Sequence, residues 1–313
     1  MTTQFAFVFP GQGSQAVGML DAWGDHPEVV RTLAEASAAL GEDIGALIKN
    51  GPKEQLDLTT NTQPVMLTAG IACYRAWIAE TGLVPAAAAG HSLGEYTALV
   101  ASGALSLADA LPLVRFRAQA MQEAVPVGVG AMYAVLGLDG DAVRAGCAQA
   151  AAESGEVIEA VNFNDPKQTV IAGSKAGAEK AAEILKAAGA KRTLPLPVSA
   201  PFHSSLMKPA AERLKERLSA TNFGAQTFPV INNIDVAVTT DADATRDALY
   251  HQAFGPVRWV EVVQALKARG ITHIIECGPG KVLAGMAKRI DGELHSATVL
   301  DPASLAEMKG MLL

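Results

Sequence analysis

The sequence predicts an α/β fold with a mostly parallel sheet, into which a smaller α/β domain is inserted. Apolar, strand-like segments at residues 5–9, 84–89 and 274–277 alternate with segments of helical spacing, a succession typical of a parallel sheet covered by helices on both faces. A Gly-His-Ser-Leu-Gly turn at residues 90–94 stands between one strand and a helix. Between residues 128 and 198 the order of elements changes, which marks the inserted domain.

The composition is that of a water-soluble globular enzyme. The chain has 313 residues, of which 50% are hydrophobic and 18% charged, enough for one large and one small domain. A net charge of −7 without any Lys/Arg block argues against nucleic-acid binding. Residues 1–4 lack a basic signal region and no apolar run reaches membrane length, so we expect a cytoplasmic protein without a membrane segment.

The cysteines predict no metal site. Cys73, Cys147 and Cys277 are widely spaced and form no Cys-x-x-Cys pair, so we expect reduced, buried thiols. A reactive Cys277 is the less favoured alternative.

The first predicted strand, residues 5–9, ends at a glycine-rich loop, residues 10–15. The loop lacks both the Walker spacing and a full Gly-x-Gly-x-x-Gly, so a nucleotide site is not favoured. It is either a plain turn or a loop that directs Gln12 across a pocket mouth. Helical spacing follows at residues 28–50, and a long apolar helix is predicted from Gln63-Pro64 through Ala79.

The turn at residues 90–94 matches Gly-x-Ser-x-Gly, the pattern of a nucleophile elbow, in its required strand–turn–helix setting. Gly90 and Gly94 leave room for a strained turn that exposes the Ser92 hydroxyl. The Leu93 N–H then lies at a helix N-terminus, where it can donate to an oxyanion. The elbow favours an α/β hydrolase-like core; a chance match in a Gly/Ala-rich chain is the alternative.

The next helix is predicted from Ser106, a candidate N-cap, to Glu123. Arg115 and Arg117 flank its apolar stripe on opposite sides, and periodicity alone does not say which faces the interior. For either arginine the ordinary expectation is a solvated side chain.

The segment 128–198 is predicted as a ferredoxin-like small domain because its elements run β-α-β-β-α-β. The remainder, residues 1–127 and 199–313, is assigned to the hydrolase-like catalytic domain. The strands of the small domain are expected at 131–136, 158–163, 168–172 and 191–196, and its helices at 141–152 and 176–188. Beyond it, helices are expected at 206–221, 260–269 and 281–289, and strands at 230–234, 274–277 and 296–300.

A serine nucleophile needs a base, and His203 is the favoured candidate because it lies in a proline-bounded loop at a strand-to-helix junction. His91 adjoins Ser92, but successive residues at a sharp turn point apart. His251 remains a further candidate. Three other histidines lie in segments expected to be exposed or structural: His26, His273 and His295.

No acidic residue stands out as the group that would orient the histidine. Asp235, Asp241 and Glu276 are candidates in a hydrolase-style order, without a supporting motif. Gln252, Asn162 or a backbone carbonyl could hold the imidazole instead, with less stabilisation of its charged form.

Taken together, six motifs resemble the malonyl-CoA:acyl carrier protein transacylases of fatty acid synthesis. The resemblance spans essentially the whole chain and rests on FPGQGSQ from Phe9, GHSLGEY from Gly90, Arg117, VNFN from Val161, PFHS from Pro201 and GPG from Gly278.

The resemblance implies a role for eight residues. Ser92 would be the acyl-accepting nucleophile and His203 its base, with Gln12 and the Leu93 N–H as the oxyanion hole. Arg117 would bind the malonyl carboxylate. Substrate-binding positions would be Gln252, Asn162 and Phe202, the last of which goes with unbranched malonyl units in related polyketide acyltransferases.

Malonyl-CoA and an acidic acyl carrier protein are therefore the expected partners, with no cofactor and no metal. Asp165 stands where many relatives carry a small hydroxyl residue. Basic residues that could contact the carrier are Lys186, Lys191, Arg192, Lys281, Lys288 and Arg289. The alternatives are a trans-acting acyltransferase of a polyketide pathway, a serine hydrolase, and a catalytically silent scaffold.

Overall fold

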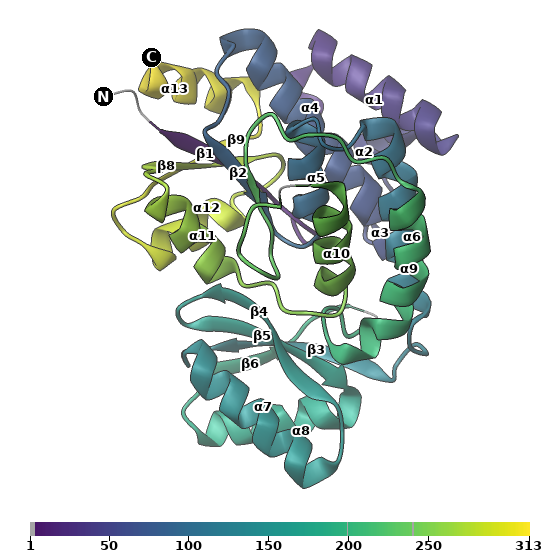
Figure 1. The fold of residues 1–313 in the computed structure, drawn as a ribbon, viewed down its shortest axis with the longest axis vertical. Helices are drawn as coiled ribbons and strands as arrows, with labels where there is room; N and C mark the ends of the chain where they lie inside the picture. Colours follow the sequence, from purple (N-terminus) through teal and green to yellow (C-terminus); the bar gives the residue numbers. More distant parts are fainter. Residues whose placement is uncertain (1–3, 199, 240) are drawn as a thin grey trace.

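The protein is a mixed α/β molecule built on two sheets, as the sequence predicts (Figure 1). The computed structural model describes residues 4–198, 200–239 and 241–313. The predicted boundary at Ser199, and most of the segment at residues 1–4, lie outside the described residues.

The larger sheet has five parallel strands in the order β7-β2-β1-β8-β9. Their bounds are β1 Phe5–Phe9, β2 Ala87–Gly90, β7 Val230–Ile231, β8 His273–Cys277 and β9 His295–Val299. Because all five run the same way, the segments that follow their carboxyl ends meet at one edge of the sheet. The residues after β1, β2 and β7 are brought together there.

Alternation along β1 separates two apolar layers. Phe5, Phe7 and Phe9 face one side, where the Phe7 ring meets Trp77 edge-on at 5.5 Å between centroids. Ala6 and Val8 face the other side and pack in a second cluster. Small residues on one face and large rings on the other let helices pack at both surfaces of a fully buried sheet.

Helices cover both surfaces of this sheet (Figure 1). On the phenylalanine side are α1 Pro27–Leu40, α2 Ile44–Asn50, α3 Lys53–Leu56, α4 Thr59–Thr81, α5 Leu93–Ala101, α6 Leu107–Glu123, α9 Lys208–Ala220, α10 Ala242–Gln252 and α13 Pro302–Leu312. On the alanine side are α11 Trp259–Ala268 and α12 Val282–Ile290.

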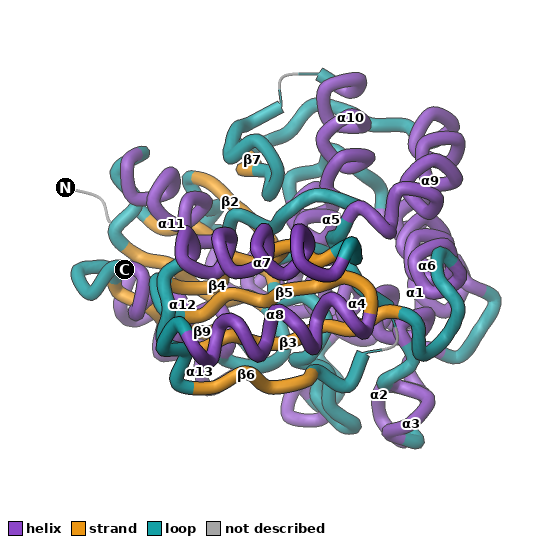
Figure 2. Tube along the Cα trace, turned by 90° about the horizontal axis from the view of Figure 1, so that it is seen from below, coloured by secondary structure: helices purple, strands orange, loops and turns teal. Residues whose placement is uncertain are grey.

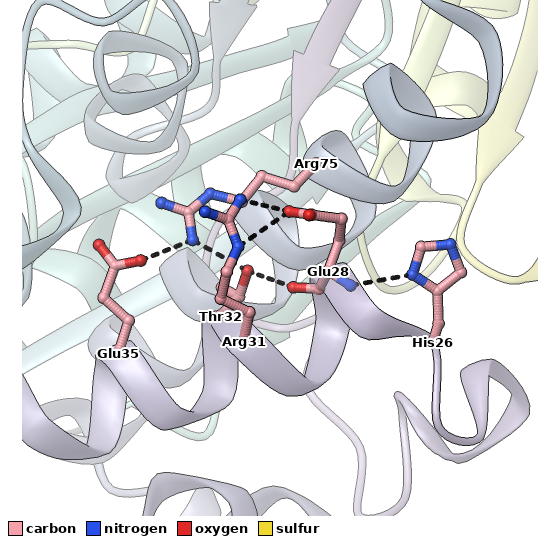
Figure 3. Close-up of polar contacts among 6 residues, drawn as sticks. All are labelled: His26, Glu28, Arg31, Thr32, Glu35 and Arg75. Atoms are coloured by element: carbon pink, nitrogen blue, oxygen red, sulfur yellow. Dashed lines mark hydrogen bonds and ion pairs between the residues drawn. The ribbon is translucent and has the colours of Figure 1, made fainter.

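Polar contacts fasten α1 to α4 at the surface (Figure 3). Arg75 of α4 donates to Thr32 Oγ1 at 3.1 Å and to Glu35 Oε2 at 2.7 Å, both on α1. Glu28 pairs with Arg31 alongside, and the His26 ring accepts from the Glu28 N–H at the start of the helix. These partly exposed pairs hold the register of two helices whose apolar faces supply most of the packing.

The smaller sheet is antiparallel, in the order β4-β5-β3-β6. Its strands are β3 Gly130–Leu136, β4 Ile158–Asp165, β5 Gln168–Ser174 and β6 Arg192–Pro195. Two helices, α7 Gly140–Ser154 and α8 Lys175–Ala187, lie across one face, in front of the strands in Figure 2. The Val257 N–H donates to the Val161 carbonyl of β4 at 2.8 Å, and the Val257 carbonyl accepts from the Phe163 N–H at 3.0 Å. These two bonds join the smaller sheet to the part of the molecule that holds the larger sheet.

Some elements differ from the sequence expectations. The helix expected to open at Gln63 begins at Thr59 instead, so Pro64 is inside it. This proline removes one backbone hydrogen bond near the N-terminal end of a long helix, most of whose residues are buried. The strand expected at 230–234 ends at Ile231, because Asn232 starts a turn. Helices α10 and α13 lacked a sequence assignment, although Asp241 and Asp301 cap them. No helix in the described part of the chain has the length and apolar character needed to cross a membrane.

Candidate active site

Ser92 lies at the turn between β2 and α5, in a backbone conformation that side chains rarely adopt, with φ 52°. Glycines on either side make the turn possible. A Cβ at Gly90 would lie 1.9 Å from the Gly94 carbonyl carbon, and one at Gly94 would lie 2.0 Å from the Phe9 carbonyl oxygen. The strand, the turn and the helix therefore pack with their backbones in contact, which only glycine permits.

The Ser92 hydroxyl contacts His203, with Oγ 2.7 Å from Nε2. The other ring nitrogen, Nδ1, lies 2.9 Å from the main-chain carbonyl oxygen of Gln252. A carbonyl oxygen can only accept, so Nδ1 carries the ring hydrogen and Nε2 is left to accept from Ser92. Burial, assisted by the Arg117 charge, lowers the pKa of His203 to about 3. The imidazole is therefore a neutral acceptor near pH 7.

The acids considered from the sequence are not the partners of this histidine. Asp241 caps α10 by accepting from the Ala244 N–H, Glu276 accepts from the Ala284 N–H, and Asp235 is exposed. The orienting group is the backbone carbonyl, one of the neutral alternatives that the sequence left open. Neither the Gln252 side chain nor Asn162 holds the ring.

Arg117 is the arginine of α6 that faces the interior. It is 1% exposed, whereas Arg115 reaches outward to Glu42 and Asn61. The Arg117 Nη2 donates to Ser92 Oγ at 3.2 Å and to Gln252 Oε1 at 3.0 Å, and Nη1 donates to Gln63 Oε1 at 2.9 Å. Its Nε–H has no hydrogen-bond partner among the described residues. A buried cation with neutral partners and a spare donor, beside the serine, suits an anionic ligand.

A cavity of about 130 Å³ opens in front of Ser92. The predicted site residues that line it are Gln12, Ser92, Leu93, Arg117, Asn162, Phe202 and His203. Gln252 does not line the cavity, and its side-chain amide instead donates to the main-chain carbonyl of Ser92. Apolar side chains of Met121, Met132, Val170, Leu196 and Val198 complete the wall, and residues from both sheets therefore share one cavity.

Two groups are placed to meet negative charge in this cavity. Leu93 is the first residue of α5, so its N–H has no intrahelical acceptor and points from a helix N-terminus. The exposed Gln12 side chain also lines the cavity and donates to Thr59 Oγ1 at 3.4 Å. A partly exposed serine, a neutral imidazole, a helix N-terminus and a cation can transfer an acyl group that carries its own carboxylate.

Other residues that support the site were not anticipated from the sequence. The Asn233 side chain accepts from the Ser92 N–H at 2.8 Å and donates to the Gly90 carbonyl at 2.7 Å, which secures the strained turn. Its position just after the edge strand β7 is a signal that could have been used, because functional residues gather at carboxyl ends of parallel strands. Gln63 is predicted from the sequence only as the start of a helix. His91 points away from Ser92, with its Nε2 at 2.8 Å from Asn164 Oδ1.

The chain is similar to known proteins over nearly its whole length. Residues 6–304 match the family model described as acyl transferase domain. A malonyl CoA-acyl carrier protein transacylase of Escherichia coli strain K12 is 53% identical over 305 residues, which is 97% of this chain and 98% of the relative.

Solved structures resemble the chain closely as well. An acyl-carrier-protein S-malonyltransferase from Burkholderia pseudomallei 1710b superposes with a TM-score of 0.97 at 66% identity, covering 98% of this chain and all of the other. A type II polyketide synthase acyl-carrier protein in complex with its malonyl-transacylase gives 0.96 at 47% identity, covering 99% of this chain and all of the matched chain.

Proposed function

We propose, because this chain belongs to the malonyl CoA-acyl carrier protein transacylases of the acyl transferase domain family, that it moves a malonyl group from malonyl-CoA to the pantetheine thiol of an acyl carrier protein. The observation that carries the proposal is the 3.2 Å contact between the Arg117 guanidinium and Ser92 Oγ. An acyl group esterified to this serine has a buried cation beside it, and a malonyl group brings the carboxylate that such a cation binds.

In the first half-reaction the Ser92 oxygen attacks the thioester carbonyl of malonyl-CoA while His203 Nε2 accepts the hydroxyl proton. The tetrahedral oxyanion accepts from the Leu93 N–H and from Gln12. The carbon–sulfur bond then breaks, His203 returns its proton to the departing sulfur, and a malonyl ester remains on Ser92.

The second half-reaction reverses these roles. The carrier thiol attacks the ester carbonyl, His203 takes the thiol proton, and the Ser92 oxygen leaves and is reprotonated. Because the malonyl donor and the carrier thiol bind in turn, the kinetics are ping-pong. A backbone carbonyl suffices to hold the His203 tautomer, although it stabilises the imidazolium less than a carboxylate would.

The remaining site residues select the acyl group. Phe202 is proposed to limit the space beside the malonyl methylene, and Asn162, whose Oδ1 is buried without a partner among the described residues, to bind the thioester or pantetheine. Gln252 acts on the substrate indirectly, because its amide oxygen holds Arg117.

We also propose the finer fold assignment. Residues 1–127 and 199–313 would form an α/β hydrolase-like domain with Ser92 at a nucleophile elbow, which the strand–turn–helix geometry supports. Residues 128–198 would form a ferredoxin-like domain, supported by the antiparallel order β4-β5-β3-β6. A cytoplasmic location is proposed from the same family membership.

The carrier would dock on exposed basic residues. All six candidates are exposed: Lys186, Lys191, Arg192, and, on or beside α12, Lys281, Lys288 and Arg289. The Arg289 Nε–H donates to Oδ2 of the buried Asp165 at 2.7 Å. Asp165, which stands where many relatives carry a small hydroxyl residue, would therefore orient an arginine that is a candidate contact of the carrier. Because Arg289 and Asp165 carry opposite charges, this part of the surface attracts acidic proteins in general only weakly.

A second candidate function is malonyl transfer in polyketide synthesis rather than fatty acid synthesis. The similarity to the malonyl-transacylase solved with a type II polyketide synthase carrier protein favours keeping it. A serine hydrolase is disfavoured because it would leave the buried Arg117 without a purpose. A silent scaffold is disfavoured by the 2.7 Å contact between Ser92 and His203.

Intact-mass measurement of the enzyme after malonyl-CoA, with and without holo carrier protein, tests the proposal. We expect a malonyl adduct on Ser92 that is stable in water and transfers to the carrier thiol. An adduct that is lost without any carrier would indicate a hydrolase, and absence of any adduct would refute the assignment. Parallel trials with fatty acid and polyketide carriers separate the two pathways.

A further inference from the structure

Glu95 is a buried acid, 2% exposed, in the first turn of α5. Its Oε2 accepts from the Asn233 N–H at 2.9 Å and from the Gln252 side-chain amide at 3.0 Å. None of the steps proposed above uses it.

Both donors to Glu95 hold the reacting groups. Asn233 secures the backbone of the Ser92 turn. Gln252 makes three further contacts: its main-chain carbonyl accepts from His203, its amide N–H donates to the Ser92 carbonyl, and its amide oxygen accepts from Arg117. Through Asn233 and Gln252, Glu95 is thus one hydrogen bond away from groups that contact Ser92, His203 and Arg117.

The charge of Arg117 needs a counterpart inside the protein. Its hydrogen-bond partners, Gln63, Ser92 and Gln252, are all neutral, and the Tyr96 ring lies 5.4 Å from the guanidinium carbon. Glu95 is joined to Arg117 through the two ends of the Gln252 amide. An amide that donates to a carboxylate and accepts from a guanidinium is fixed in one orientation and polarised by both charges.

We propose that Glu95 is a positioning residue that orients the Gln252 amide toward Arg117, that its ionised form balances the guanidinium charge in the malonyl-free enzyme, and that this form takes up a proton when the malonyl carboxylate binds Arg117. This inference rests on the malonyl transfer proposed above. The added step is balanced: Ser92 exchanges its proton for the malonyl group, CoA leaves as the thiol, and a solvent proton converts the Glu95 carboxylate to the acid.

The electrostatic surroundings support this coupling. Burial raises the pKa of Glu95 to about 7, although Gln252, Asn233 and Arg117 act to lower it. The charged or titratable groups around Glu95 are Arg117 on α6, Tyr96 beside it on α5, His203 behind Gln252, and Asp235 after β7, whose charge acts to raise the pKa of Glu95. A malonyl carboxylate on Arg117 adds a second negative charge nearby, so it raises the pKa of Glu95 further.

The sign of the pH dependence follows. Below pH 7 the free enzyme holds Glu95 protonated, and malonyl binds without moving a proton. As the pH rises through the free-enzyme pKa of about 7, binding requires proton uptake and weakens, by up to about tenfold per pH unit. His203 does not titrate in this range, because its pKa is about 3.

Acetyl-CoA is the matched substrate for the test, since it carries the same phosphates and thioester but no carboxylate. We expect the KM for malonyl-CoA divided by the KM for acetyl-CoA to rise about five- to tenfold between pH 6.5 and 8.5 in the wild type. In Glu95→Gln, which keeps an accepting oxygen but cannot ionise, the ratio should vary by less than about twofold.

Two control variants separate this effect from general ones. Glu276→Gln removes another buried acid, whose pKa burial also raises to about 7 but which contacts α12 rather than the site. Asp235→Asn removes the exposed acid near Glu95. Glu276→Gln should follow the wild-type pH curve, whereas Asp235→Asn should keep the pH dependence with its midpoint at slightly lower pH, because the Asp235 charge acts to raise the pKa of Glu95. A Glu95→Gln enzyme that also keeps the wild-type curve would overturn the proposal.

A measurement on the unmodified enzyme decides the matter if Glu95→Gln fails to fold. A pH indicator in weak buffer at pH 7.5 should report uptake of a substantial fraction of a proton per site on malonylation, beyond that on acetylation, while intact mass counts the adducts. Malonyl adducts without extra uptake would refute the role of Glu95 and leave the transfer reaction standing. Missing adducts would instead refute the proposed function.

Discussion

Replacing Arg117 by alanine tests whether the buried guanidinium recognises the malonyl carboxylate. The guanidinium now donates to three neutral oxygens, on Gln63, Ser92 and Gln252. A malonyl carboxylate would replace two of these neutral contacts with charge-assisted ones, which are roughly twice as strong. With about 1.5–3 kcal/mol for each bond to a charged acceptor against about 1 for a neutral acceptor, the two bonds together differ by about 1–4 kcal/mol.

That difference corresponds to a loss of about 5- to 1000-fold in kcat/KM for malonyl-CoA. Acetyl-CoA gains nothing from the guanidinium, so its kcat/KM should change by less than about threefold. The assay is acyl-enzyme formation under single-turnover conditions, followed by intact mass for each CoA ester. Arg117→Lys is the matched variant, because it keeps the charge but loses the fork that binds both oxygens, and we expect intermediate activity.

The same substitution also changes the histidine. Arg117 is one of the causes that lower the pKa of His203, so its removal should raise that pKa and shift the acid limb of the acetyl-transfer profile to higher pH. Equal losses for malonyl and acetyl transfer, with an unshifted acid limb, would show that Arg117 only supports the fold.

Three further predictions concern the nucleophile, the turn and the buried acids. Ser92→Ala should abolish the malonyl adduct while leaving the circular dichroism spectrum intact, and an undiminished adduct would refute the nucleophile. Gly94→Ala should destabilise the protein by about 3 kcal/mol or more in urea unfolding, because the new Cβ would lie 2.0 Å from the Phe9 carbonyl oxygen; Gly292→Ala, whose Cβ would meet nothing within 4 Å, is the control. The pKa of Glu276 is raised by burial from 4.5 to about 7, so the folded state binds the extra proton and stability should fall as the pH rises from about 4.5 through 7. Because Glu95, whose pKa is also raised to about 7, contributes to the same fall, Glu276→Gln should make that part of the stability curve less steep, and an unchanged slope would show that Glu276 does not contribute.

Local chemistry was enough to predict much of this protein. The alternation of Phe5, Phe7 and Phe9 with small residues predicts a strand buried on both faces, and Gly90 and Gly94 predict a strained turn, because both follow from steric rules that act within a few residues. The β-α-β-β-α-β order of residues 128–198 likewise follows from periodicity and turn chemistry, and the strands and helices lie there in that order.

The tertiary structure decided what depends on contacts distant along the chain. Arg115 and Arg117 flank the same apolar stripe, and only the packing of α6 against α4 and the neighbouring helices buries one and leaves the other partly exposed. The histidine is held by the main chain of Gln252, and backbone carbonyls, being identical at every residue, leave no trace in the order of side chains. Asn233, Gln63 and Glu95 join the site through contacts with residues distant along the chain, and of these three only Asn233, just after a strand, has a position that hints at its role.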